Sequence, residues 1–575
     1  MNRNLIKQAR GAELADLVFK NCKVINVFTK TIEIEDVAIS NGIILGTGKY
    51  FGKKEIDCKD FFVSPGFIDG HVHIESSMLT PTGYAKVVMP KGTTSVIADC
   101  HEIANVCGKP GVRYMIDSAD RTPLDVFMMI PSCVPSTPFE TSGAVLNSKD
   151  LIELKKLKNV LGLGEMMNYP GVISGDPETH DKLDAYHDRI IDGHVPSVFG
   201  KDLNAYILSG IYTDHESTSP LELIDKVKKG MYIHLREGSQ TRNVIDLLPA
   251  VSNDYSNRLM FCSDDLHPSD IIKDGHINNN INIASKHGLN PITAIQMATI
   301  NIATCYNLKN YGAIAPGYYA DLVFFEDIKN IQPKYVYKKG KLVAKKGKPL
   351  FDALSLVDKN VENTVNMNLD NFDYSFNLKF DIVNVIQLVK NNVITRKHVE
   401  QVELIDGDIN LKKSDDLLKL FVIERHHATG NVGKALISGY GLKNAAIALS
   451  IAHDSHNVIV VGDNEKDVSV AINKIQEIQG GIVLVRDGEV FDSLNLEVAG
   501  IMTNKDAVYV KDKLENMEKE IRKLGVKEDI DDPFLVLAFL SLPVIPDIKC
   551  TDMGLFDVRK FKIISIEAGE DEWKT

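Results

Sequence analysis

The 575-residue sequence has no pair of cysteines close enough together to form a zinc or redox motif. Its eight cysteines stand at positions 22, 58, 100, 107, 133, 262, 305 and 550, so no CxxC occurs. This spacing suits reduced thiols better than a disulfide framework. The cysteine pattern therefore predicts a cytoplasmic protein.

The sequence also lacks a long apolar run and an excess of basic charge. Its most apolar stretch, residues 533–546, is too short to span a bilayer and contains prolines, so we expect a buried core segment there. The N-terminal residues carry charges throughout, unlike a signal peptide. A net charge of −13, from 65 Lys+Arg against 78 Asp+Glu, argues against binding to a nucleic-acid backbone. The expectation is a protein without nucleic-acid or membrane partners.

Short apolar strands alternate with helical stretches in the first half of the chain. We count eight such strands, at residues 61–73, 93–102, 124–135, 159–168, 190–196, 210–217, 231–239 and 259–265. Alternation of strand and helix predicts a parallel sheet, and eight units predict an α/β fold with a (β/α)8 TIM-like barrel over residues 61–308. Residues 1–60 and 309–354 look like flanking strands, and residues 355–575 like a separate C-terminal α/β domain.

Histidines and carboxylates fall where these strands end, which is where such a barrel carries its active site. The candidate ligands are His71, His73, Glu165, His194, His215 and Asp264. His71 and His73 are two apart in a strand, so both can face the barrel mouth. A set of nitrogen and oxygen donors without thiolate suits Mn, Fe or Zn. The pattern predicts a two-metal site.

Longer segments resemble a known family. PGFIDGHVHIESS, and NPITAIQMATINIATCYNL followed by GAIAPGYYADLVFF, resemble the amidohydrolase superfamily. TTSVIADCHEIANVCG, GLGEMMNYPGV and GYGLKNAAIALSIAHDSHNVIVVG are similar to the adenine deaminases within it. The resemblance implies that the two flanks form one small β-sandwich beside the barrel, and that residues 355–575 form an adenine-deaminase-type domain.

The resemblance also implies a reaction, the hydrolytic deamination of adenine to hypoxanthine and ammonia in purine salvage or catabolism. By position, His71 and His73 would bind one metal ion, and His194 and His215 the second. Glu165 would bridge them and serve catalysis, because its strand reads LGLGEMM and offers no lysine for that role.

The same resemblance assigns the proton transfer to one aspartate. Asp264, rather than the adjacent Asp265, would bind metal and move the proton. The implied cofactors are two divalent ions, Mn²⁺ or Fe²⁺ rather than Zn²⁺. The implied partners are the small molecule adenine and a second copy of the chain in a homodimer.

Other polar residues could contact the substrate. They are Glu75, Asp99, His101, Glu102, Arg236, Glu237, Ser239, His453 and His456. For each of them a rim hydrogen bond, an ion pair or a loop contact is the structural alternative. The residue that protonates N1 of the purine stays open among Glu75, Glu102 and Glu237. We expect His276 at the surface.

Two other functions are compatible with the pattern. One is another amidohydrolase with a glutamate on the fourth strand, such as an N-acetylglucosamine-6-phosphate deacetylase. The other is a catalytically silent barrel that serves as a scaffold, as among dihydropyrimidinase-like proteins. The C-terminal domain argues against the first alternative, and the complete ligand set argues against the second.

Overall fold

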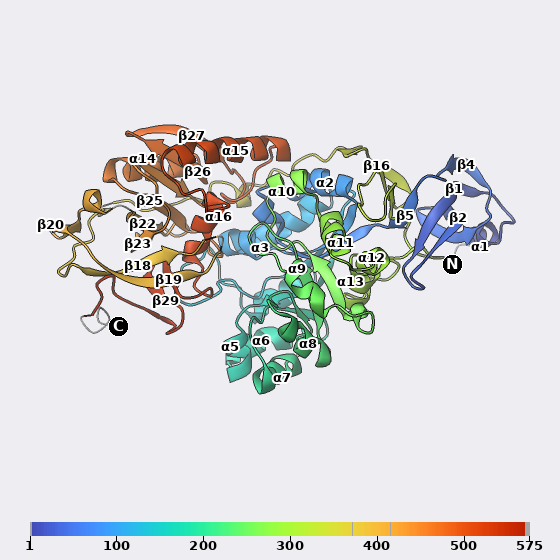
Figure 1. Cartoon of the computed structure of the whole chain (residues 1–575), viewed down its shortest axis with the longest axis horizontal. Coiled ribbons are helices and arrows are strands. Elements are labelled where there is room, and N and C mark those ends of the chain that lie inside the picture. The colour runs from blue at the N-terminus through green and yellow to red at the C-terminus, as the bar shows by residue number, and fades with distance from the viewer. Residues whose placement is uncertain (1–2, 371, 391, 415, 570–575) are drawn as a thin grey trace. The chain divides into compact units, whose positions relative to one another are not determined.

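The computed structural model describes residues 3–370, 372–390, 392–414 and 416–569 (Figure 1). The chain forms two compact units. Unit 1 comprises Met1–Cys100, Met115–Ser132 and Asn147–Leu356, and unit 2 comprises His101–Tyr114, Cys133–Leu146 and Val357–Thr575. Within the described residues, no helix is both long enough and apolar enough to cross a membrane.

The eight predicted barrel strands are all present in unit 1, which confirms the predicted fold class. They are β6 Phe67–Val72, β7 Thr93–Asp99, β8 Asp125–Ile130, β9 Val160–Met166, β10 Ile190–Gly193, β11 Thr213–Asp214, β12 Tyr232–Arg236 and β13 Leu259–Cys262. β6 to β10 form a five-stranded parallel sheet, and β11 to β13 form a three-stranded one. A parallel bridge between Val72 and Asp264 links the end of β6 to the chain that follows β13. Every residue of β6 and β7 is buried, as expected for strands covered on both faces.

Helices separate these strands along the chain. They are α2 Pro81–Val88, α3 His101–Ala119, α4 Ser148–Leu154, α5 Tyr169–Ser174, α6 Pro177–Ala185, α7 Gly200–Leu208, α8 Pro220–Lys228, α9 Val244–Leu247, α10 Pro268–Lys273, α11 Ile277–Lys286, α12 Pro291–Met297 and α13 Ile300–Cys305. α12 begins after Asn290, whose side chain accepts a hydrogen bond from the backbone N–H of Ile292, so the cap is formed by the residue that the sequence suggests.

The two flanks of the barrel meet in one nine-stranded sheet. Its strands are β1 Ala15–Asn26, β2 Thr31–Ser40, β3 Ile43–Gly48, β4 Gly52–Asp57, β5 Phe62–Pro65, β14 Leu322–Phe325, β15 Tyr335–Lys338, β16 Lys341–Lys345 and β17 Lys348–Pro349, and α1 Arg3–Ala9 precedes them. β5 and β14 pair antiparallel and so join the two halves. Phe19 packs against Phe324 and Tyr337, with ring centroids 4.8 Å apart in each pair.

Unit 2 is built on an eight-stranded sheet in the order β19-β18-β23-β22-β25-β24-β26-β27. The strands are β18 Ile382–Leu388, β19 Thr395–Gln401, β22 Leu418–Ile423, β23 Val432–Ser438, β24 Ala445–Leu449, β25 Val458–Gly462, β26 Gly481–Arg486 and β27 Glu489–Asn495. α14 Glu465–Glu477 places Val468, Ala471, Ile472 and Ile475 in the core of this sheet.

Smaller elements complete unit 2. They are β20 Leu404–Ile405, β21 Asp408–Ile409, α15 Ala507–Lys523, α16 Pro533–Ala538, β28 Ile548–Thr551, β29 Gly554–Asp557 and β30 Lys562–Ile563. All of α16 is buried, in agreement with the core segment expected there. Residues 101–114 and 133–146 also belong to this unit, although they alternate with barrel strands in the sequence.

Candidate metal centre

The end of β6 carries the first pair of predicted ligands. His71 and His73 are both buried, and their Nε2 atoms lie 3.1 Å apart. His73 Nδ1 lies 3.1 Å from the carbonyl oxygen of Asp99. Because a carbonyl can only accept, that Nδ1 carries the hydrogen and Nε2 keeps its lone pair for a metal ion.

Glu165, at the end of β9, faces both pairs of histidines. Its Oε1 lies 3.3 Å from His73 Nε2 and 4.0 Å from His71 Nε2. Its Oε2 lies 2.7 Å from His194 Nδ1 and 3.3 Å from His215 Nε2. Each oxygen of one carboxylate therefore serves one pair, which is the arrangement that a bridging ligand needs.

Asp264 follows β13 and completes the cluster. Its Oδ1 lies 3.2 Å from His73 Nε2 and 3.6 Å from His71 Nε2, while its Oδ2 accepts a 2.6 Å hydrogen bond from Arg236 Nη1. The neighbouring Asp265 instead accepts a 2.5 Å hydrogen bond from the Ser76 hydroxyl through Oδ1. The geometry therefore favours Asp264 as the aspartate of the centre.

The donor set fits divalent cations. The ligand atoms fall into groups of three that lie within 4.8 Å of one another, among them His71–His73–Glu165, His71–His215–Asp264 and Glu165–His194–His215. Two imidazole nitrogens 3.1 Å apart, beside two buried carboxylates, bring together donors and negative charge that a divalent cation would bind. Nitrogen and oxygen donors alone suit Mn, Fe or Zn.

The electrostatics of the cluster lead to the same conclusion. Burial raises the pKa of Glu165, but hydrogen bonds with His194, His215 and His73 outweigh it and hold that pKa well below its usual range. Burial lowers the pKa of His215, but Glu165 and Asp264 raise it to about 9. The carboxylates are thus ionised and draw positive charge to the centre, and a metal ion can take the place of that proton.

Sequence reasoning missed one carboxylate of this centre, Glu216. It directly follows His215, and its Oε1 lies 3.4 Å from His215 Nε2 and 3.7 Å from His194 Nδ1. Arg236, at the end of β12, forms an ion pair with both Glu216 and Asp264. The acidic residue next to a predicted ligand in TDHES was the available signal.

Three other candidates in unit 1, Asp99, Glu237 and Ser239, have identified hydrogen-bond partners. Asp99 accepts a 2.9 Å hydrogen bond from the backbone N–H of Glu165. Glu237 accepts one of 3.3 Å from Val244 N–H, and burial raises its pKa to about 7. Ser239 donates to Asp270 at 2.5 Å. Glu75 lies buried in the 3-10 turn that follows β6.

The candidates in unit 2 form a second buried cluster. His453 Nδ1 lies 2.7 Å from Glu102 Oε1, and His456 Nε2 is in very close contact with Glu102 Oε2. His101 Nε2 lies 3.4 Å from Glu102 Oε1 and 3.7 Å from Asp454 Oδ1. Glu102, His453 and His456 also have the composition of a metal site.

One backbone contact assigns the hydrogen of His456. The N–H of Ala452 donates to His456 Nδ1 over 3.1 Å, so Nδ1 is an acceptor and Nε2 must carry the hydrogen of the neutral ring. Burial raises the pKa of Glu102, but the imidazoles of His453 and His456 outweigh it and hold that pKa well below its usual range. Burial lowers the pKa of His456 to about 4, although Glu102 acts to raise it. The cluster is therefore a carboxylate held by imidazole N–H groups.

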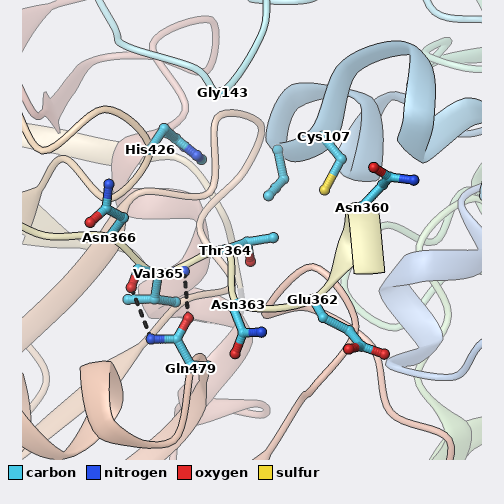
Figure 2. A pocket seen from close by; sticks show the side chains of 11 residues that line it. Cys107, Gly143, Asn360, Glu362, Asn363, Thr364, Val365, Asn366, His426 and Gln479 are labelled. Atoms are coloured by element: carbon cyan, nitrogen blue, oxygen red, sulfur yellow. Dashed lines mark hydrogen bonds between the residues drawn. The ribbon is translucent and has the colours of Figure 1, made fainter. Parts of the chain in front are cut away.

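Unit 2 also contains a polar pocket of 480 Å³ (Figure 2). Its walls include Cys107, Thr364, His426 and Gln479, and the Gln479 amide bonds both the N–H and the carbonyl of Val365. Among the described residues that line it, none is a predicted site residue.

The expectation for His276 was wrong. This residue is buried, with Nδ1 2.7 Å from the Thr93 hydroxyl and Nε2 2.9 Å from the Tyr84 hydroxyl. Its Nε2 also lies 3.2 Å from Asp69, which in turn accepts a hydrogen bond from Ser263 N–H. This network links Asp69 within β6 to Ser263, which follows β13. Its members come from distant parts of the chain, so no local sequence pattern predicts that His276 is buried.

Comparisons with known proteins identify the family. A family model described as "Amidohydrolase family" matches residues 62–343, and one described as "Adenine deaminase C-terminal domain" matches residues 392–562. The chain is 45% identical to "Adenine deaminase 2" of Carboxydothermus hydrogenoformans, over 98% of this chain and 99% of that protein. It is 47% identical to the adenine deaminase of Clostridium acetobutylicum, over 97% and 99%. Among solved structures, the beta-aspartyl dipeptidase of Fervidobacterium islandicum AW-1 matches with 16% identity and a TM-score of 0.45, over 59% of this chain and 98% of that one.

The barrel, its flanking sheet and the first family model define an amidohydrolase. With relatives this similar over nearly its whole length, the chain belongs to the adenine deaminase family.

Proposed function

We propose that the chain hydrolyses adenine to hypoxanthine and ammonia, with two divalent metal ions held by His71, His73, Glu165, His194, His215 and Asp264. The observation that carries the proposal is the Glu165 carboxylate, which faces one histidine pair with each oxygen. The names of the relatives supply the substrate.

The metal ions and the side chains of the centre have different roles in the proposed reaction. Metal ions bound there lower the pKa of a water molecule toward neutrality. Asp264 accepts the proton of the water that adds to C6 of adenine, and returns it to the amine that leaves as ammonia. The geometry supports this role, because its Oδ1 lies 3.2 Å from His73 Nε2. Arg236 and His73 outweigh burial and hold the pKa of Asp264 well below its usual range, so the group is ionised. Glu165 stays ionised between the two histidine pairs and holds them in place through its hydrogen bonds.

The ring needs a second proton at N1 as C6 becomes tetrahedral. Glu75 and Glu237 are the proposed donors, because the imidazoles around Glu102 keep the pKa of that carboxyl well below its usual range. The contacts to substrate are proposed to come from them together with Asp99, His101, Glu102, Ser239, His453 and His456. Glu237, whose pKa is raised to about 7 by burial, would hold a proton near neutral pH.

We further propose that the ions are Mn²⁺ or Fe²⁺, that the protein is a cytoplasmic homodimer, and that it serves purine salvage or catabolism. The free base should be preferred over adenosine. A site that hydrogen-bonds N9–H would leave its buried partner unpaired when a ribose occupies N9.

The test is release of ammonia from adenine by protein loaded with Mn²⁺, compared with metal-stripped protein and with Glu165→Gln. We expect activity in the first sample alone, and a higher kcat/KM for adenine than for adenosine. Full activity after exhaustive removal of metal, or in Glu165→Gln, would refute the centre. Deacetylation of N-acetylglucosamine 6-phosphate without adenine turnover would support the other amidohydrolase function.

A further inference from the structure

Asp264 has its two carboxylate oxygens assigned to different partners. Oδ1 faces His73 and His71, and Oδ2 takes the hydrogen bond from Arg236 Nη1. A carboxylate can rotate about its Cβ–Cγ bond, so the Arg236 contact determines which oxygen is presented to the metal centre. Asp264 also has a positive φ of 56°. Few backbone conformations are allowed there, so the backbone can do little to move the carboxylate if the Arg236 contact is lost.

Arg236 is in turn held by Glu216. Nη2 of Arg236 donates to Glu216 Oε2 over 3.1 Å, and Nη1 contacts both Glu216 Oε1 and Asp264 Oδ2. A two-point contact of this kind fixes the plane of a guanidinium, which a single contact would leave free to turn. The side chains of Arg236 and Glu216 are only 8% and 15% exposed, so water competes little for these bonds.

The backbones that carry the pair are fastened to each other. Asn243 Oδ1 accepts a 2.7 Å hydrogen bond from Arg236 N–H, and Asn243 Nδ2 donates to the carbonyl of Ser217 over 3.0 Å. One side chain thus joins the end of β12 to the chain that follows β11, where Glu216 lies. The separation between Glu216 and Arg236 is therefore set by the barrel.

The charges in the site explain why Arg236 needs Glu216 beside it in order to orient Asp264. Without Glu216, the guanidinium would be balanced by Asp264 only, and would repel cations bound to the histidines. Without Arg236, Glu216 and Asp264 would bring two carboxylates to the same buried place with no guanidinium between them. The pair keeps Asp264 oriented while leaving Oδ1 directed toward His73 and His71.

We infer that Glu216 and Arg236 act together as a positioning pair for Asp264, and that neither contacts the purine. The inference rests on the proposed function, since it assigns the pair to the proton transfer made by Asp264. It also changes the expectation for Arg236, whose Nη1 and Nη2 are occupied by carboxylates rather than directed to substrate.

The experiment compares five variants of the Mn²⁺-loaded protein: Glu216→Gln, Arg236→Lys, Arg236→Met, Asp264→Asn, and Glu216→Gln combined with Asp264→Asn. We expect Glu216→Gln to lower kcat about 10–100-fold with KM changed by less than about threefold and two ions retained. Arg236→Lys should retain more activity than Arg236→Met, because lysine keeps the positive charge. It should still be slower than wild type, because lysine lacks the paired N–H groups of the guanidinium. The double variant should be no slower than Asp264→Asn alone, because the pair acts through that residue.

Asp321→Asn provides the matched control. Asp321 forms a buried ion pair of 2.7 Å with Lys338 in unit 1, outside the metal cluster, so this variant should lose stability and keep kcat. A rise in KM with unchanged kcat would overturn the inference by showing contact with substrate. Loss of a metal ion would identify Glu216 as a ligand instead, and multiplied losses in the double variant would make the pair independent of Asp264. An inactive wild-type protein would refute the proposed function itself, whereas an active wild type with unimpaired variants would refute only the pair.

Discussion

The carboxylate of Asp99 holds the backbone of Glu165, because its Oδ2 accepts a 2.9 Å hydrogen bond from the Glu165 N–H. The preceding residue must be glycine, since a Cβ on Gly164 would lie 1.9 Å from the same oxygen. The end of β7 thus positions the proposed bridging ligand on β9. This gives Asp99 a structural role next to the metal centre, in addition to the substrate contact proposed for it.

Asp99→Ala should therefore weaken metal binding. Loss of an outer partner of a ligand typically costs about 10–100-fold in affinity or activity. The measurement is the Mn²⁺ content after dialysis against graded chelator. Unchanged retention together with a raised KM for adenine would instead indicate that Asp99 serves the substrate only.

Asp264→Asn should reduce turnover by about 10²–10⁴-fold, the usual contribution of general acid–base catalysis. Asp265→Asn is the neighbouring control, because Asp265 accepts a hydrogen bond from Ser76 and should cost much less. Steady-state kcat for adenine decides between them. The reverse ranking would mean that Asp265 moves the proton.

Gly70→Ala should destabilise the barrel. A Cβ at this position would lie 2.7 Å from His234 Cδ2 and 2.8 Å from the carbonyl oxygen of Phe261. Both residues are buried, so neither can move away without disturbing its neighbours. Overpacking of this kind costs about 1–3 kcal/mol. Thermal unfolding of the variant should begin at a lower temperature, whereas Gly569→Ala, with open space around its Cβ, should leave the transition unchanged.

Much of the barrel and of its metal centre could be predicted from local patterns in the sequence. Eight buried strands could be counted because each is a short apolar run, and an i, i+2 pair such as His71 and His73 shares one face of a strand. Glu216 was missed because alternation turns the residue after His215 away from it in a regular strand, whereas β11 already ends at Asp214. The burial of His276 depends on Asp69, Tyr84 and Thr93, which lie about two hundred residues earlier. The assignment of residues 101–114 to unit 2 is equally non-local, because the strand–helix alternation continues through them.

Lys549 should make the stability of the protein depend on pH. Its side chain is fully buried, its Nζ donates to the carbonyl of Val393 over 2.8 Å, and burial lowers its pKa to about 7. Between pH 7 and the ordinary lysine pKa of about 10.4, the unfolded chain binds a proton that the folded chain does not, so stability falls as pH drops through this window. Lys549→Met should be more stable than wild type at pH 7, and the difference should shrink toward pH 10. Denaturant titrations at both pH values measure it, and a constant difference would contradict the depressed pKa.

The cluster of Glu102, His453 and His456 should bind no ion of its own, although its composition is that of a metal site. The Ala452 N–H occupies Nδ1 of His456, so its Nε2 carries a hydrogen and has no lone pair for a metal. Glu102→Gln should therefore leave the metal content of the protein unchanged, while destabilising it by about 1–3 kcal/mol, because two buried imidazole N–H groups lose their charged acceptor. Elemental analysis and denaturant unfolding of the same preparation test both parts. A metal ion lost from Glu102→Gln but kept in Asp321→Asn would show that the imidazoles coordinate rather than donate, and the hydrogen assigned to His456 would then be wrong.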